Sequence, residues 1–353
     1  MKSFEEKVID VSEKLNNILD DCECSPKEKD ITLAFFEKLK HYFQSLYDFE
    51  GRVRDMENNE KILRSNFEKY QSTIISEIYS FEKKIRSNII KKRVRELFRS
   101  AVGEYIFESP ITKRAFEKPR GYPGDYLIFE MFYNDSYAPE GTGYFLDKWI
   151  LDHPLPKGAI YRKNKLKEML SQIIEGNKNK LKILNIGCGP SRDLRELISE
   201  NMDMGNVYIT CLDQDDEALK FSEDEVNKIQ RHNNISFIKH DIISICLNRK
   251  TKQLDKQNVI YSLGVADYFM KTTLENFIRY CFDLLEPKGK LIIPLCSSHE
   301  PELYIPLRWF CEWDFYSHDA NEIRDFVEKE IGIEKVKVIW EKSQPIFFVI
   351  IEK

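Results

Sequence analysis

A short glycine-rich turn follows the first strand pattern in the second half of the chain. Leu181–Ile186 is a mostly apolar run, and Gly187, Gly189 and Pro190 interrupt it at once. Because glycine lacks a Cβ atom, a ligand can come close to its backbone. A helical pattern resumes after Ser191, and the start of such a helix offers free N–H groups and a positive dipole end. This spacing predicts a strand, a ligand-binding turn and a helix.

Acidic residues after the next two strand patterns indicate what the turn could bind. The dinucleotide fingerprint has a third glycine where this chain has Arg192, so an ordinary tight turn remains the alternative to pyrophosphate binding. Asp213 ends the next strand pattern, about twenty residues further on, where a carboxylate can accept both ribose hydroxyls. Asp241 ends the following one, where it can meet the edge of an adenine. The two acids and the turn together favour one nucleoside-containing ligand.

A second unusual stretch lies upstream, at Lys118–Tyr126, and contains two prolines and two glycines. This composition predicts a rigid, irregular loop. The loop carries Arg120, Tyr122, Asp125 and Tyr126, whose polar groups could hold a ligand. A structured linker between domains is the alternative, and the pattern alone does not separate the two.

Strand and helix patterns alternate from residue 181 onward, which predicts a parallel sheet covered by helices. In such a sheet, ligands bind at the carboxyl ends of the strands. The last two strands are too close for a crossover helix, so they should form an antiparallel hairpin around Ser343–Pro345. The expected strands are 181–186, 207–212, 235–239, 258–263, 290–296, 335–340 and 346–351.

Residues 1–100 have a helical pattern. Apolar residues from Phe4 to Ile18 recur at intervals of three and four, which is typical of a helix seam. Ser25, Pro26 and Glu28 have the pattern of a helix start, and Gly51 is expected to end or interrupt that helix. The basic stretch 83–99 is more simply a solvated helix face than a site for an anionic partner. We expect these helices to cover a catalytic domain or to form a homodimer.

Composition limits the class of protein. The chain has 353 residues, 42% of them hydrophobic, and a formal net charge of −5, which argues against a nucleic-acid partner. No signal peptide and no apolar run of membrane-spanning length is evident, so we expect a cytoplasmic protein. The eight cysteines show no Cys-x-x-Cys spacing and are expected to be free thiols, with no metal site.

The arrangement from about residue 165 to 353 resembles the class I S-adenosylmethionine-dependent methyltransferases. The resemblance rests on Ile183–Pro190, Asp213, His240-Asp241 and the terminal hairpin, with Asn185 where the family commonly has an acid. It implies an α/β, Rossmann-like sheet of seven strands, preceded here by an all-helical N-terminal domain. The expected boundaries are 1–100 for the helices, 101–165 for a lid or connecting segment, and 166–353 for the methyltransferase domain.

A narrower resemblance covers roughly residues 100–353. Lys118–Tyr126 and Tyr261–Tyr268 are similar to sequences of the bacterial enzymes that make 3-hydroxypalmitic acid methyl ester, in extracellular factor biosynthesis. Trp309–Arg324 is compatible with the same group. The resemblance implies transfer of a methyl group to the carboxylate of a fatty or hydroxy-fatty acid. A methyltransferase acting on nucleic acid or protein, and a non-catalytic S-adenosylmethionine-binding module, are the alternatives.

These resemblances imply a set of site residues. A carboxylate acceptor is already ionised at neutral pH and needs only a group that places it. The candidates for that role are Arg120, Tyr122, Tyr268, His299 and Arg308. The expected S-adenosylmethionine-binding residues are Arg162, Asn185, Gly187, Cys188, Gly189, Asp213, Gln214, Asp241, Ile242, Ser262, Leu263 and Gly264.

Overall fold

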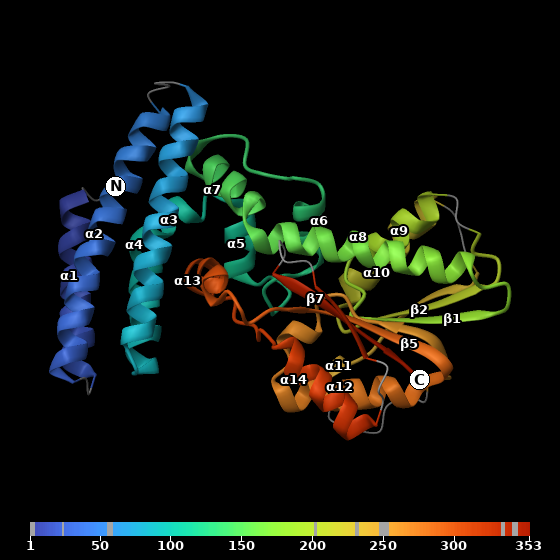
Figure 1. Ribbon diagram of the computed structural model, residues 1–353. Coiled ribbons are helices and arrows are strands. Elements are labelled where there is room, and N and C mark those ends of the chain that lie inside the picture. Colours follow the sequence, from blue (N-terminus) through green and yellow to red (C-terminus); the bar gives the residue numbers. More distant parts are fainter. Residues whose placement is uncertain are drawn as a thin grey trace. The chain divides into compact units, whose positions relative to one another are not determined.

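The chain divides into two compact units (Figure 1). The computed structural model describes residues 4–22, 25–54, 59–200, 203–229, 233–246, 254–332, 336–340 and 345–353. Unit 1 comprises Met1–Pro123, Asp135–His153 and Pro301–Trp313. Unit 2 comprises Gly124–Asn134, Pro154–Glu300 and Asp314–Lys353. Each unit is therefore assembled from stretches that are far apart in the sequence.

Unit 1 is helical. Its α-helices are α1 (Phe4–Asp21), α2 (Pro26–Arg54), α3 (Glu60–Lys84), α4 (Asn88–Ile106), α5 (Pro110–Glu117), α7 (Gly141–Asp152) and α13 (Ile305–Cys311). The expected start of α2 is confirmed. The Glu28 N–H donates to Ser25 Oγ at 3.3 Å, and the three-residue spacing from Ser25 to Glu28 is that of a capping box. The expected break at Gly51 is wrong: α2 continues through it to Arg54. A Cβ atom on Gly51 would meet no described atom within 4 Å beyond the nearby backbone of its own helix. No packing contact with the described residues therefore requires glycine at this position.

The core of unit 1 includes a tryptophan from late in the chain. Trp309, on α13, is fully buried, and its ring meets Phe35, Phe81 and Phe98 edge-on at centroid distances of 5.4–6.2 Å. Its Nε1–H donates to Glu82 at 2.9 Å. Aromatic rings of this size dominate the energetics of a core. The stretch 301–313 therefore belongs structurally with the N-terminal helices.

Three arginines of the basic stretch at 83–99 form ion pairs inside unit 1. Arg95 pairs with Glu82 at 2.7 Å, and Arg93 with Asp21 at 3.3 Å. Arg99 is buried, pairs with Glu312 and donates to the Trp309 carbonyl. Lys83, Lys84, Arg86 and Lys92 are exposed, as expected for a solvated helix face, whereas the buried Arg99 departs from that expectation.

A buried carboxyl in unit 1 leads to a pH prediction. Asp147, on α7, accepts from Ser109 Oγ and from the Ala138 N–H at 2.8 Å, and burial raises its pKa to about 6. Because the pKa of Asp147 is higher in the folded protein than in the unfolded chain, ionisation of this carboxyl favours unfolding. The stability that the protonated carboxyl contributes is present below pH 4 and is lost as the pH rises through 6. From pH 4 to pH 7, Asp147→Asn should gain up to about 3 kcal/mol of unfolding free energy relative to wild type. Denaturant titrations of both proteins at the two pH values measure this difference.

Comparison with wild type is essential for this measurement. Burial lowers the pKa of His153 to about 4, so its contribution to stability is lost as the pH falls from 6.5 toward 4. His153 therefore acts against Asp147 in the same window. A difference between variant and wild type that stays constant with pH would show that Asp147 does not titrate there.

Unit 2 is built on one mixed sheet of seven strands in the order β3-β2-β1-β4-β5-β7-β6. The strands are β1 (Leu181–Ile186), β2 (Val207–Asp213), β3 (Ile235–Lys239), β4 (Gln257–Tyr261), β5 (Leu285–Cys296), β6 (Val336–Trp340) and β7 (Ile346–Glu352). The first five pair in parallel, and β7 is antiparallel to both β5 and β6. The predicted α/β sheet with a closing hairpin is confirmed; Ser343 and Gln344 of the expected turn lie outside the described residues.

Helices cover both faces of this sheet. On one face, α8 (Pro154–Glu175), α9 (Arg192–Ser199) and α10 (Asp216–Ile229) pack against the apolar side chains of β1 and β2. On the other, α11 (Ile242–Cys246), α12 (Lys271–Leu284) and α14 (Ala320–Phe326) pack against β4, β5 and β7. Figure 1 shows α8 running along the sheet above β7 and β5, with α12 and α14 below. This layering leaves the carboxyl ends of the parallel strands together at one edge.

Strand β4 ends earlier than expected, at Tyr261. Ser262, Leu263 and Gly264 form a loop at the carboxyl edge, where Gly264 has a φ of +106° that a strand residue with a side chain rarely adopts. The loop leads to the short 3₁₀ helix η1 (Ala266–Tyr268). No helix among the described residues is long and apolar enough to span a membrane.

Candidate active site

The two glycines of the turn after β1 have different surroundings. Gly187 has a φ of +69°, and a Cβ atom on it would lie 1.9 Å from Cγ2 of Val265. Gly189 has a φ of +50°, and a Cβ there would meet no described atom within 4 Å beyond its chain neighbours. Gly187 is therefore required by protein packing, whereas Gly189 exposes its backbone to open space. A ligand can approach the chain at Gly189.

Asp213, at the end of β2, is tied directly to that turn. Its Oδ2 accepts from the Gly189 N–H at 2.8 Å and its Oδ1 from the Asp215 N–H at 3.0 Å. Burial raises the pKa of Asp213, and these backbone donors act against that rise. The Gln214 N–H also acts on this carboxylate, which has about four acceptor positions, so at least one remains for a ligand hydroxyl. Asp213 therefore lies directly beside the glycine turn, and its role in binding a ligand stays a prediction.

Two polar side chains at this edge are buried without hydrogen-bond partners. Asn185 lies on β1 in register with Tyr261 of β4, and both of its amide atoms lack a partner within the described part of the chain. Ser262, directly after Tyr261, has an unpartnered Oγ under the same condition. Buried polar groups are nearly always hydrogen-bonded, and each unpaired one costs about 1–3 kcal/mol. Unpaired groups beside an open turn fit a polar ligand that completes their hydrogen bonds.

Arg162, on α8, reaches the end of β4. Its guanidinium is buried, donates to Asp267 at 2.9 Å, and lies against Gly264, where a Cβ would be 2.6 Å from Nη2. Burial acts to lower the pKa of Arg162, but the Asp267 carboxylate outweighs this and the pKa is raised. Nε has no partner among the described residues. Arg162 thus offers a permanently charged donor at the carboxyl edge.

The remaining expected cofactor residues differ in exposure. Cys188 is buried, and its hydrogen bond with the neighbouring Cys211, together with burial, holds its thiol pKa well above the ordinary value. Ile242 is buried beside Gly187: its Cδ1 lies 3.5 Å from the position that a Cβ atom on Gly187 would occupy. Gln214 and Asp241 are exposed, and Asp241 accepts from the Ile243 N–H at 3.0 Å, near the start of α11. Leu263 is half-buried. The structure therefore gathers the glycine turn, Asp213 and Ile242 around one point.

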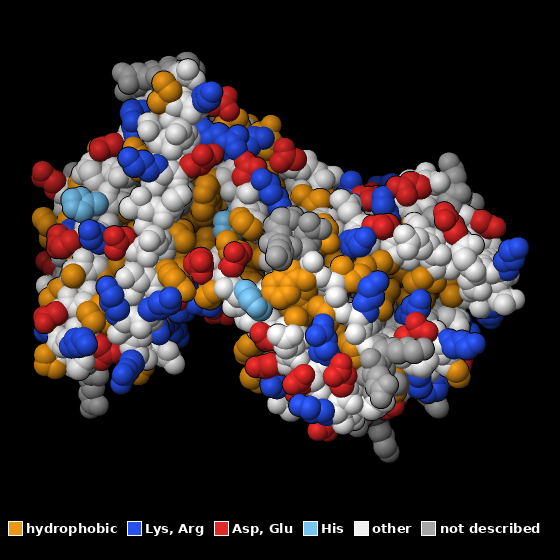
Figure 2. Space-filling view, in the orientation of Figure 1, with side chains coloured by type: hydrophobic (Ala, Val, Ile, Leu, Met, Phe, Trp, Pro, Cys, Tyr) orange, Lys and Arg blue, Asp and Glu red, His pale blue; other side chains and the backbone are white. Residues whose placement is uncertain are grey.

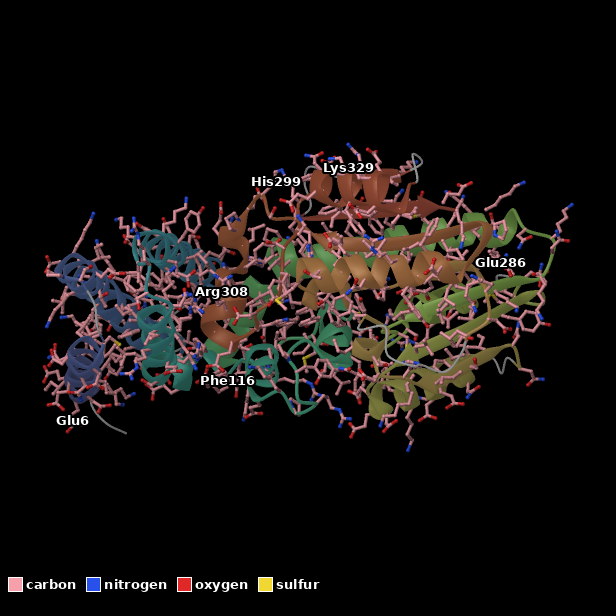
Figure 3. All side chains as sticks on the ribbon, turned by 90° about the horizontal axis from the view of Figure 1, so that it is seen from below. Glu6, Phe116, Glu286, His299, Arg308 and Lys329 are labelled. Carbon is pink, nitrogen blue, oxygen red and sulfur yellow. The ribbon has the colours of Figure 1, made fainter. Side chains whose placement is uncertain are left out.

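The expected acceptor-placing residues fall in both units. Tyr268 and His299 belong to unit 2, and Arg120, Tyr122 and Arg308 to unit 1. His299 is exposed on the loop after β5, with Nδ1 3.0 Å from Ser297 Oγ and its ring against Trp340 (Figure 3). Arg308 donates to Glu82 at 2.9 Å inside unit 1. A role for any of these five in placing an acceptor stays a prediction.

Contacts that no sequence pattern indicates anchor α6 (Tyr126–Tyr133) within unit 2. Glu130 is buried and pairs with Arg195, and with Arg192 at 3.2 Å, both on α9 directly after the glycine turn. The Tyr126 ring lies 5.0 Å from that of Phe221 on α10. Tyr126 and Arg192 stand out in the sequence, whereas no pattern there singles out Glu130 or Arg195. Residues 124–134 thus pack beside the turn, whereas 118–123 belong to unit 1.

Asp193 on α9 is a second residue that was missed. It is buried, burial raises its pKa, and it accepts from the Tyr261 hydroxyl at 2.7 Å. This bond joins the helix after β1 to the end of β4, next to Asn185 on the neighbouring strand.

Comparison with known proteins agrees with this geometry. Residues 177–344 match a family model described as a methyltransferase domain. No curated protein matches the chain.

Three solved structures are similar to this chain, and two of them, with TM-scores above 0.5, share its fold. A protein from Bordetella parapertussis, described as a possible exported protein, has a TM-score of 0.54 and 12% identity, and the match covers 90% of this chain and 96% of that one. The CurJ carbon methyltransferase has a TM-score of 0.51 and 10% identity over 100% and 99% of the two chains. Magnesium protoporphyrin IX methyltransferase from Synechocystis PCC 6803 has a TM-score of 0.46 and 13% identity over 74% and 99%.

The sheet order, the open glycine turn and the family match lead to one conclusion. The antiparallel β7 inserted beside β5 distinguishes this sheet from an all-parallel dinucleotide-binding one. Residues 177–344 of this chain therefore match a methyltransferase domain, and the sheet that they build has the class I, Rossmann-like fold.

Proposed function

We propose that this enzyme methylates a carboxylate oxygen of a small acyl molecule, with S-adenosylmethionine bound at the Gly187–Gly189 turn. The observation that carries the cofactor's placement is the combination of an open Gly189 with the unpartnered, buried Asn185 and Ser262. These groups would hold the polar part of the cofactor. The bound cofactor would supply an electrophilic methyl group on a sulfonium.

The other residues at the edge have separable tasks. Asp213 would accept from the ribose hydroxyls, using the positions that Gly189 and Asp215 leave open. Asp241, exposed at the end of β3, would meet the adenine edge. The Arg162 guanidinium would face the cofactor carboxylate, since its Nε has no partner among the described residues.

The acceptor is proposed to be a fatty or hydroxy-fatty acid. The support is the similarity of Lys118–Tyr126 and Tyr261–Tyr268 to the enzymes that form 3-hydroxypalmitic acid methyl ester. A carboxylate is ionised near neutral pH, so the protein needs to orient it in line with the methyl group and needs no general base. Arg120, with its planar donor fork, suits that task. Tyr122, Tyr268 and His299 are further candidates.

A transfer assay tests this proposal. The enzyme is incubated with methyl-labelled S-adenosylmethionine and long-chain or 3-hydroxy acids, and the organic products are treated with alkali. A methyl ester releases labelled methanol under alkali, whereas a methyl group on carbon or nitrogen does not. We expect alkali-labile label that depends on the acid. Alkali-stable label would overturn oxygen methylation, and label transferred to RNA or protein instead would overturn the acceptor class.

Asn185 provides a prediction in which stability and affinity change differently. Asn185→Leu removes two unpaired buried polar atoms while nearly keeping their volume. Without cofactor, the unfolding free energy should stay constant or rise by about 1 kcal/mol. Cofactor affinity should fall about tenfold or more, because hydrogen bonds to the ligand are lost. Chemical denaturation and calorimetric titration measure the two effects.

Asn185→Ala is the matched control for this variant. It removes the same amide but leaves a cavity, so it should weaken both stability and binding. Unchanged cofactor affinity in both variants would remove Asn185 from the site.

The assembly and location of the protein are further proposals. Val11 and Leu15 of the expected α1 seam are buried in the described chain, and Phe4, Val8 and Ile18 are half-buried, so the seam is partly covered without a second copy. A homodimer through the exposed faces of the N-terminal helices stays a prediction, which sedimentation of the full chain tests. A cytoplasmic location also stays a prediction and is tested by cell fractionation.

A further inference from the structure

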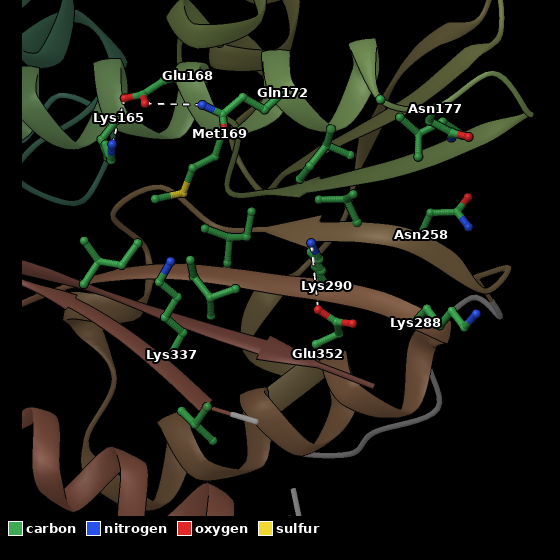
Figure 4. Close-up of a pocket in the computed structure, with 18 of the residues that line it drawn as sticks. Lys165, Glu168, Met169, Gln172, Asn177, Asn258, Lys288, Lys290, Lys337 and Glu352 are labelled. Carbon is green, nitrogen blue, oxygen red and sulfur yellow. Dashed lines mark hydrogen bonds and ion pairs between the residues drawn. The ribbon is translucent and has the colours of Figure 1, made fainter. Parts of the chain in front are cut away.

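A groove lies in unit 2 on the face of the sheet beneath α8 (Figure 4). Its volume is about 810 Å³, within the range of small-molecule sites. It reaches β1 and β4 at Leu181 and Asn258, near the start of each strand. The glycine turn follows the other end of β1. The groove is therefore separate from the cofactor site, at the opposite edge of the sheet.

Aliphatic side chains form the floor of the groove. Met169 and Ile173 contribute from α8, and Ile339 and Ile350 from β6 and β7. All four are only partly buried at the margin of the apolar core. Figure 2 shows hydrophobic side chains beside Lys and Arg side chains on this face of unit 2. No aromatic residue is among the described lining residues, so the floor suits an aliphatic chain better than a stacked ring.

Charges around the floor are unbalanced. Four lysines and two glutamates line the groove: Lys165, Lys288, Lys290, Lys337, Glu168 and Glu352. Lys165 pairs with Glu168 at 2.8 Å and Lys290 with Glu352 at 3.8 Å. Lys288 and Lys337 are exposed and form no ion pair within the described residues. In Figure 4 the Lys337 side chain extends from β6 toward the space below α8.

We propose that this groove binds an anionic amphiphile, with an aliphatic chain on the floor and a carboxylate paired with Lys337. Burying the chain removes apolar surface of both partners from water, and the carboxylate neutralises an unpaired ammonium. A second copy of the chain fits less well: a two-fold interface would bring the unpaired lysines of both copies together. The inference does not rest on the proposed acceptor, because the groove and the glycine turn lie at opposite edges.

Calorimetric titration with dodecanoate tests the proposal. Saturable binding should weaken about tenfold in Lys337→Glu and in Lys337→Met, the loss of one charge-assisted contact. Dodecanol, which has the chain without the charge, should bind more weakly than dodecanoate to wild type. Lys220→Glu is the matched control: it reverses an exposed lysine on α10, outside the groove, and should bind as wild type does.

Crosslinking locates the ligand. A photoreactive dodecanoate analogue should label peptides from α8, β6 and β7, and excess dodecanoate should suppress the label. Label confined to peptides around Gly187–Gly189 would overturn the proposal, since the carboxylate would then occupy the active site. Binding that is equal in Lys337→Glu and wild type would also overturn it, as would self-association that Lys337→Glu abolishes. Methyl transfer in Lys337→Glu is measured separately and should persist, so failure of this inference is distinct from failure of the proposed function.

Discussion

Placing one methyl group on Gly187 and one on Gly189 should damage the enzyme in two different ways. Both positions have positive φ, so alanine at either costs about 1–2 kcal/mol of backbone strain. At Gly187 the new Cβ also meets Val265 Cγ2 at 1.9 Å, which adds about 1–3 kcal/mol of overpacking. Gly187→Ala should therefore lose about 2–5 kcal/mol of unfolding free energy.

At Gly189 the new Cβ meets no described atom within 4 Å, so it projects into the space proposed for the cofactor. Gly189→Ala should lose only the unfolding free energy that comes from backbone strain, but it should bind S-adenosylmethionine about tenfold or more weakly. Denaturant unfolding without cofactor and calorimetric titration give the two quantities for each variant.

A double variant separates the two costs expected for Gly187→Ala, backbone strain and the clash with Val265. Adding Val265→Ala to Gly187→Ala removes the colliding methyl and should restore the overpacking part of the loss, with the backbone part remaining. The same addition should not restore cofactor affinity in Gly189→Ala. Wild-type affinity in Gly189→Ala would show that the cofactor does not approach the chain there.

Removing Asp267 should have the second large effect, on stability. Asp267 is buried, accepts from Arg162 at 2.9 Å and also from the Cys296 N–H at 2.8 Å. Its loss leaves the Arg162 charge buried and unpaired, which typically costs about 3–5 kcal/mol. Asp267→Ala should therefore unfold at a much lower denaturant concentration than wild type, and equilibrium unfolding measures the change.

Two further variants check the cause. Arg162→Met in the Asp267→Ala background removes the uncompensated charge and should recover part of the loss. Lys271→Ala breaks an exposed pair with Glu322 and should leave the unfolding curve unchanged within error. If Asp267→Ala were as stable as wild type, Arg162 would have to find another partner or solvent in the folded protein.

The sequence alone determined the elements that have a local signal. Apolar patterns located the seven strands: continuous runs the buried ones, and alternation the half-buried β3 and β6, while β5 begins at Leu285, earlier than its apolar run predicted. Gly187 and Gly189 predicted an open turn because positive φ and close approach both require glycine. The short spacing before β7 predicted an antiparallel hairpin, since a parallel crossover needs more residues. From this topology the position of Asp213 beside the turn followed.

Boundaries that depend on a single residue were less secure. Gly51 was expected to break α2, yet the helix continues, because a glycine costs only about 1 kcal/mol and packing of the rest of a long helix outweighs it. The apolar Leu263 predicted a strand two residues longer than β4, which ends at Tyr261. The chain turns at Gly264, whose φ is positive. Local composition does not show where the hydrogen-bonded ladder stops.

Only the tertiary structure decided which distant residues meet. Trp309 enters the core of the N-terminal helices, Glu130 joins the arginines of α9, and Arg162 pairs with Asp267. No spacing rule predicts these pairs, because each depends on how whole elements pack. The unpartnered state of Asn185 and the groove beneath α8 are likewise properties of assembled surfaces. A sequence pattern reports the energetics of one element, whereas a site or a groove exists only once several elements have enclosed it.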